Sequence, residues 1–166
     1  MNTNPHNPFD HGYFETNELK LFGFKHVGEN VKISKTATIV GLSNISIGNN
    51  IRIDGGSIIT ARTGFLMLGD YIHIGCNTFL GCAGGISISD FSGISHGVCI
   101  YSGSDDYSGS FLTNPLIPEE FSNTHLAPVA LEKHVIIGSG SVILPGVNIG
   151  IGAAIGALSL VTKSLE

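Results

Sequence analysis

The sequence predicts an all-β protein whose chain winds into a solenoid of short parallel strands, a parallel β-helix. Two observations predict it. An aliphatic residue returns at every sixth position near the C-terminus, at Ile137, Ile143, Ile149, Ile155 and Val161, and glycine directly follows three of these, at 138, 150 and 156. Neither the 3.6-residue period of a helix nor the alternation of a strand explains a spacing of six. Short strands joined by glycine-assisted bends do, because stacked coils then bury one aliphatic column.

The six-residue spacing continues upstream from Ile33 to Ile100. Three steps in it are longer by two or three residues: Ile39 to Ile47, Ile59 to Leu68, and Leu80 to Ile88. We expect these insertions to bulge outward at corners of the coil without displacing the core.

The spacing disappears between Ile100 and Leu131. Residues 101–130 therefore form a long loop that leaves the coils, and a loop of this length inside a compact domain favours a functional role. Residues 1–30 also lack the spacing and are expected to cap the first coil, with one helical turn capped by Asn17 and ended by Gly23. The predicted organisation is a cap (1–30) and a β-helix domain (31–166) interrupted by the loop.

Composition narrows the possible partners. The 166 residues include 23 glycines and only 13% charged residues, which suits one corner-rich solenoid domain. The net charge of -5, with eight scattered lysines and arginines, argues against nucleic acid or an anionic membrane as a partner.

The location of the protein and the state of its cysteines are predicted from the same sequence. No export signal and no stretch long enough to span a bilayer are found, so a cytoplasmic location and no transmembrane segment are expected. Three cysteines in such a chain are expected to be reduced packing residues, at 76, 82 and 99.

The C-terminal run VIIGSGSVILPGVNIGIGAAIGALSLVTKS resembles the hexapeptide-repeat acyltransferases. The resemblance implies a left-handed β-helix, assembly as a homotrimer, and acetyl-CoA as co-substrate in the cleft between neighbouring subunits. The family's chains usually continue past V-T-K into a tail that lines the cofactor groove, whereas this sequence stops at Glu166.

Within that family the sequence looks like the branch that O-acetylates galactosides, maltose and O-antigens. This implies an acetyl-CoA-dependent O-acetyltransferase acting on a hydroxyl of a sugar or of a surface-polysaccharide precursor. Two alternatives stay open, an N-acetyltransferase acting on an amino-sugar nucleotide and a non-catalytic hexapeptide scaffold.

Acetyl transfer to a hydroxyl needs a base, and histidine is the commonest one. His96 in ISHGVC is similar to the Ile-x-His hexads in which this family's catalytic histidine lies. The galactoside branch instead carries its histidine near the start of the long loop, where Asp105 stands here. Asp105, Asp106 and His125 are therefore further catalytic candidates, as the base or as its orienting partner, although adjacent acids also form turns.

The resemblance places the cofactor contacts at Ser139, Ala157, Thr162 and Lys163. Small side chains at the first two positions suit a pantetheine arm lying against the wall, and Lys163 offers a cation to the nucleotide phosphates. Ordinary corner packing and a solvated lysine are the structural alternative.

No metal is expected. The γ-type carbonic anhydrases share this solenoid and bind zinc through histidines, including a pair five residues apart. The pair with that spacing here, His6 and His11, stands outside the solenoid. His73 and His134 are interpreted as structural.

Overall fold

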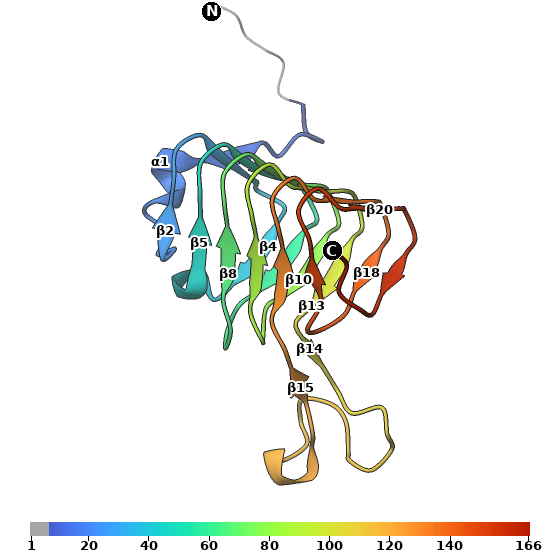
Figure 1. The fold of residues 1–166 in the computed structure, drawn as a ribbon. Coiled ribbons are helices and arrows are strands. Elements are labelled where there is room, and N and C mark those ends of the chain that lie inside the picture. The colour runs from blue at the N-terminus through green and yellow to red at the C-terminus, as the bar shows by residue number, and fades with distance from the viewer. Residues whose placement is uncertain (1–6) are drawn as a thin grey trace, which may run out of the picture.

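The computed structural model describes residues 7–166 and shows a β-helix in which three sheets, named A, B and C, form the walls (Figure 1). Each coil passes through sheet A, then C, then B. Sheet A holds β1 (Tyr13–Glu15), β3 (Val31–Ser34), β6 (Ile51–Ile53), β9 (Ile72–Ile74), β12 (Gly93–Ile94), β17 (Ile136–Ile137) and β20 (Ala154–Ile155).

The other two walls are built in the same way. Sheet C holds β4 (Thr38–Val40), β7 (Ile58–Thr60), β10 (Phe79–Gly81), β13 (Cys99–Tyr101), β18 (Val142–Ile143) and β21 (Leu160–Val161). Sheet B holds β2 (His26–Val27), β5 (Ile45–Ile47), β8 (Leu66–Leu68), β11 (Ile86–Ile88), β16 (Val129–Leu131) and β19 (Asn148–Ile149). Neighbouring strands within these walls run parallel, except for β1 against β3.

The predicted aliphatic column forms the core. Residues at its six-residue positions stack from coil to coil and are almost fully buried, among them Ile53, Ile74, Leu80, Ile100, Ile137 and Ile143. Ile39, close to the N-terminal end, is only half-buried and packs against this core. The column confirms the periodicity seen in the sequence.

All three irregular steps fall at one corner, between sheets C and B. The first contains a 3₁₀ turn, Leu42–Asn44, and the other two occupy residues 61–65 and 82–85. The core residues beyond them keep their places, because Leu68 pairs with Ile47 on one side and Ile88 on the other. The prediction that the insertions leave the core in place is confirmed.

The long loop leaves at this same corner and projects from the coils (Figure 1). Its stem is an antiparallel pair, β14 (Gly103–Ser104) with β15 (His125–Leu126), and its tip contains a 3₁₀ turn, Glu119–Phe121. The excursion is shorter at both ends than expected, because Tyr101 still belongs to β13 and Val129 already begins β16.

The N-terminal segment closes the first coil with β1 and with α1 (Thr16–Leu19). The predicted cap at Asn17 is wrong. The N-cap is Glu15, two residues earlier, and the amide of Glu15 donates to the Glu18 carboxylate over 3.1 Å. Within residues 7–166, no helix has the length and apolarity needed to cross a bilayer.

Candidate functional site

One corner of the coil brings three of the predicted residues together. We call it the A–C corner: Gly55, Cys76, His96, Ser139 and Ala157, each following a strand of sheet A. Backbone hydrogen bonds stack its residues, because the amides of Gly97, Gly140 and Leu158 donate to the carbonyls of Cys76, His96 and Ser139 at 2.9, 3.0 and 2.9 Å.

The part of this corner in the C-terminal coils is narrow. A Cβ atom at Gly138 would lie only 2.4 Å from the backbone nitrogen of Ala157, so glycine is required there by close approach of two coils. Ser139 and Ala157 therefore present a tightly stacked, small-residue wall, as the predicted cofactor contacts require.

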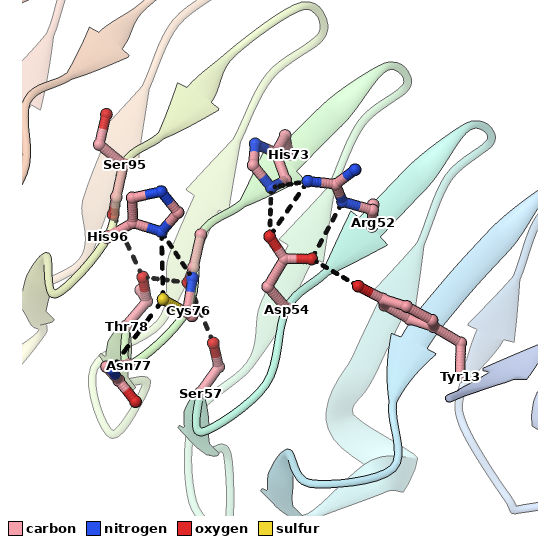
Figure 2. Close-up of polar contacts among 11 residues, drawn as sticks. Tyr13, Arg52, Asp54, Ser57, His73, Cys76, Asn77, Thr78, Ser95 and His96 are labelled. Atoms are coloured by element: carbon pink, nitrogen blue, oxygen red, sulfur yellow. Dashed lines mark hydrogen bonds and ion pairs between the residues drawn. The ribbon is translucent and has the colours of Figure 1, made fainter. Parts of the chain in front are cut away.

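His96 is oriented by the preceding coil. The backbone amide of Cys76 donates to Nδ1 of His96 over 3.1 Å, and the Cys76 thiol lies 3.2 Å from the same atom. Since a backbone amide only donates, Nδ1 must accept, and the neutral ring carries its proton on Nε2. Figure 2 shows the Nδ1 edge of the ring turned toward Cys76. In this tautomer the neutral His96 ring presents an N–H at Nε2.

A hollow of about 230 Å³ lies beside His96 on sheet A, lined by His73, Gly93, Ile94, Ser95, His96, Ile136 and Ser139. Gly93 is flanked in the sheet by His73 and Ile136, and a Cβ atom there would meet nothing within 4 Å. The missing side chain leaves a notch in the wall.

The loop candidates line a different face. Asp105 borders a hollow of about 300 Å³ on sheet C, together with Phe79, Tyr101 and Thr124. Asp106 is engaged within the loop, because its carboxylate accepts from the amide and the hydroxyl of Ser108 at 3.2 and 2.7 Å. The turn interpretation therefore describes Asp106, and not the carboxylate of Asp105.

His125 lies in β15 opposite Ser104 and is exposed. Within one chain the structure does not place His125 or Asp105 in the hollow lined by His96. The catalytic candidates thus fall into two groups, one at the A–C corner and one at the base of the loop.

Thr162 and Lys163 lie at the end of the last coil. They line a hollow of about 390 Å³ together with Gly156, which precedes Ala157, and Ser159, which follows it by two residues. The four predicted cofactor residues therefore follow one path, from the A–C corner to the C-terminal end of the coils.

A polar cluster on sheet A was not anticipated, since His73 was interpreted as structural. The Asp54 carboxylate accepts from Tyr13 Oη at 3.0 Å and His73 Nε2 at 2.7 Å, and binds Arg52 through Nε at 3.0 Å (Figure 2). Burial opposes ionisation of Asp54, but the hydrogen bonds from His73, Tyr13 and Arg52 outweigh it and hold its pKa below the usual range.

The sequence did carry a signal for this cluster. Arg52 and His73 are the polar middle residues of the strands IRI and IHI, which stack directly on each other. Ser95, which lines the hollow beside His96, was also missed. Among the described residues, no group of three or more His, Cys, Asp or Glu side chains could hold a metal ion.

The outer face of sheet C is apolar. Ile58, Phe79, Cys99, Val142 and Leu160 are successive neighbours across its strands. The outermost two are 42% and 65% exposed. This face borders the A–C corner, because sheet C begins where that corner ends.

No protein-family model matches the chain. The dTDP-4-amino-4,6-dideoxy-D-glucose acyltransferase of Escherichia coli is 48% identical over 154 residues, which cover 93% of this chain and 80% of that protein. AntD, an N-acyltransferase from Bacillus cereus solved with dTDP and coenzyme A, is 44% identical with a TM-score of 0.88, over 93% of this chain and 81% of its own.

The expected O-acetyltransferase branch is a more distant likeness. The maltose O-acetyltransferase from Clostridium difficile is 22% identical with a TM-score of 0.56, over 90% of this chain and 65% of its own, and so shares the fold alone. The similarity at high identity is to an acyltransferase of an amino sugar and to an N-acyltransferase, which corrects the branch assigned from the sequence. The chain is an enzyme with the left-handed β-helix fold that uses an acyl-CoA as co-substrate, and it belongs to the hexapeptide-repeat sugar acyltransferase family of these relatives.

Proposed function

We propose that this enzyme transfers an acyl group from acyl-CoA to the amino group of a dTDP-linked 4-amino-4,6-dideoxy sugar. The supporting observation is the 48% identity, over 93% of the chain, to the Escherichia coli acyltransferase named for that substrate. The proposal corresponds to the alternative raised from the sequence, N-acylation of an amino-sugar nucleotide, and replaces O-acetylation as the preferred activity.

The reaction defines what the site must supply. The sugar nitrogen attacks the thioester carbonyl carbon, the C–N bond forms, and the C–S bond breaks. The nitrogen loses a proton to a base, and the departing CoA sulfur takes up a proton to leave as the thiol. The site therefore needs a proton acceptor beside the amine and hydrogen-bond donors for the carbonyl oxygen, where negative charge develops.

Asp105 is proposed as the base and His96 as a donor. The Asp105 carboxylate borders a hollow and is not engaged in the turn that holds Asp106. His96 in its neutral form directs an N–H away from Cys76, which suits the carbonyl oxygen. In solved AntD variants one serine and one aspartate, ten positions apart, are replaced. Ser95 and Asp105 have that separation here.

Acyl-CoA is proposed to lie along the A–C corner, past Ser139 and Ala157, with its nucleotide end near Thr162 and Lys163. The stacked corner is straight and lined by small side chains, which matches an extended pantetheine arm. The thioester would then lie beside the notch at Gly93.

A homotrimer is proposed to complete the site, because Asp105 and His96 line separate hollows of one chain. The apolar outer face of sheet C is the surface proposed for subunit contact. Association through it would place the loop hollow of one subunit next to the A–C corner of another. Ile58→Glu and Leu160→Glu should lower the oligomeric mass measured by sedimentation, whereas Met67→Glu, equally exposed but on sheet B, should not.

The deciding experiment measures CoA thiol release with acetyl-CoA and three acceptors. These are dTDP-4-amino-4,6-dideoxyglucose, dTDP-6-deoxyglucose, which has a hydroxyl in place of the amine, and maltose. We expect turnover with the first acceptor alone. Turnover with maltose or dTDP-6-deoxyglucose at a comparable kcat/KM would contradict this proposal and support O-acetylation instead.

A further inference from the structure

A further hollow lies away from the corner proposed for CoA. It has a volume of about 490 Å³ and opens on the outer face of sheet A over β3, β6 and β9. Its polar lining comes from Asn30, Lys32, Asn50, Arg52, Tyr71 and His73. No role described above uses it.

Two of these side chains, Lys32 and Arg52, carry the positive charge that suits an anion. Lys32, Arg52 and His73 are the outward residues of three successive strands, directly paired with each other across the sheet. They therefore stand in one row on the wall. Such a row matches the oxygens of a diphosphate, which carry charge along a short chain.

The arginine is held in place by Asp54. Its Nε and Nη2 bind the two carboxylate oxygens at 3.0 and 3.2 Å, and the Asp54 side chain is only 13% exposed. A guanidinium has five N–H donors, so this fork leaves the N–H groups of Nη1 for a ligand. Asp54 thus acts as a positioning residue. Because the arginine side chain is already held in place, it loses little conformational entropy when it binds a ligand.

Lys32 has a weaker restraint. Its Nζ lies 3.4 Å from Glu15, and both side chains are about half exposed or more. An exposed ion pair of this kind contributes little. Breaking the ion pair with Glu15 therefore costs little free energy, which leaves Lys32 available to bind a phosphate.

An aromatic ring borders the same hollow. Tyr71 stacks on Phe91, and Phe91 on His134, with ring centroids 5.1 Å apart in each pair. All three residues have positive φ, between 58° and 62°, which is uncommon for bulky side chains. The stack gives the hollow a rigid aromatic edge of the kind on which a nucleobase can lie.

His73 joins this hollow to the one beside His96, since it lines both. A ligand in the large hollow would therefore extend past His73 toward Gly93 and Ser95, where the thioester is proposed to lie. Along sheet A the outward row runs from Lys32 through Arg52 and His73 to Gly93, so phosphates on this row would have the sugar on the Gly93 side.

We propose that the hollow between Lys32 and His73 binds the diphosphate of the nucleotide-linked acceptor, with Arg52 as the principal contact. This inference rests on the proposed function, because it takes the acceptor to be a nucleotide sugar. Tyr71 borders the base, and acyl-CoA approaches the same reaction centre from the C-terminal coils.

Calorimetric titration of the full chain with dTDP, thymidine and CoA tests this assignment. Arg52→Ala should weaken dTDP binding by at least tenfold and Lys32→Ala by about three- to tenfold, with little change for thymidine. CoA binding should be unchanged in both variants, which also shows that they are folded. Lys25→Ala, an exposed lysine outside these hollows, is the matched control and should bind dTDP normally.

Two failures are distinguishable. If the unmodified enzyme binds dTDP but both variants bind it equally well, the diphosphate lies elsewhere and the proposed function stands. If the unmodified enzyme binds CoA but not dTDP, the nucleotide-sugar acceptor is itself wrong and this site falls with it. Raising the salt concentration should weaken dTDP binding, and more strongly than thymidine binding.

Discussion

The amide of Cys76 donates to Nδ1 of His96 across 3.1 Å, and so a residue of one coil selects the tautomer of a histidine in the next. The sequence suggested His96 as the base of the reaction. With Nδ1 accepting this hydrogen bond, the neutral ring carries its N–H on Nε2, and the donor role proposed for it predicts other effects of substitution than the role of a base.

His96→Gln and His96→Ala distinguish the two roles. A glutamine amide donates but is not a base, so a donor role predicts partial activity for His96→Gln and a loss of about 10²-fold in kcat for His96→Ala. Steady-state kinetics at several pH values measures this. Equal losses in both variants, with the acidic limb of the pH profile abolished, would restore His96 as the base.

Asp105→Asn should reduce kcat by about 10²- to 10⁴-fold, because the variant keeps the shape of the loop but removes the proton acceptor. Asp106→Asn is the matched comparison, one residue away and engaged with Ser108. It should stay within a few-fold of the unmodified enzyme. The reverse ranking in a CoA-release assay would assign the base to Asp106.

Substitutions at two glycines, one in sheet A and one at the A–C corner, should affect activity and stability differently. Gly93→Val fills an open notch, so the melting temperature should hardly change while activity is lost. Gly138→Ala forces a Cβ atom against Ala157 and should destabilise the fold by about 1–3 kcal/mol. Thermal melts and activity assays of both variants make the comparison. A Gly93→Val enzyme with normal turnover would place the reacting groups away from this notch.

The cysteines should differ sharply in reactivity. Cys82 is fully buried, and burial raises the pKa of its thiol to about 12, so about 10⁻⁴ of it is thiolate at pH 8. Cys76 and Cys99 are partly exposed. Alkylation of the native protein, followed by mass spectrometry, should label these two first and Cys82 only after unfolding.

Asp54 should make stability depend on pH. Its pKa is lower in the folded chain than in the unfolded one, so its contribution is fully present above the unfolded value near 4 and is lost as the pH falls through the folded value. The difference in melting temperature between the unmodified enzyme and Asp54→Asn should therefore shrink below about pH 4. A difference that stays constant down to pH 2 would contradict the sign.

Much of the fold follows from the spacing of aliphatic residues, because an inward side chain at every sixth position determines which residues stack. The corner residues His96, Ser139 and Ala157 fall into one column for that reason. The sequence favours Asn17 as the helix cap because Asn is a preferred N-cap residue and Glu is not, whereas Glu15 caps the helix through its reciprocal bonds with Glu18. His73 was undervalued because its partners Arg52 and Asp54 are neighbours only after the coils are stacked.

The site itself was less accessible to sequence reasoning. The tautomer of His96 depends on an amide twenty residues earlier in the chain. The separation of Asp105 from His96 depends on the corner of the coil from which the loop projects. The six-residue period does not predict which corner that is. The choice between an amine and a hydroxyl as the acceptor is not encoded in the coil pattern at all.

Every insertion in this solenoid occurs at one edge, the corner between sheets C and B, from the short turn after β4 to the hairpin of β14 and β15. The remaining two edges keep the spacing of the coils. The hairpin can therefore be replaced, by natural variation or by design, without changes to the strands of the neighbouring sheets. Hairpins from relatives grafted in place of residues 107–123, which leave the proposed base Asp105 unchanged, would test whether this loop contributes to acceptor preference.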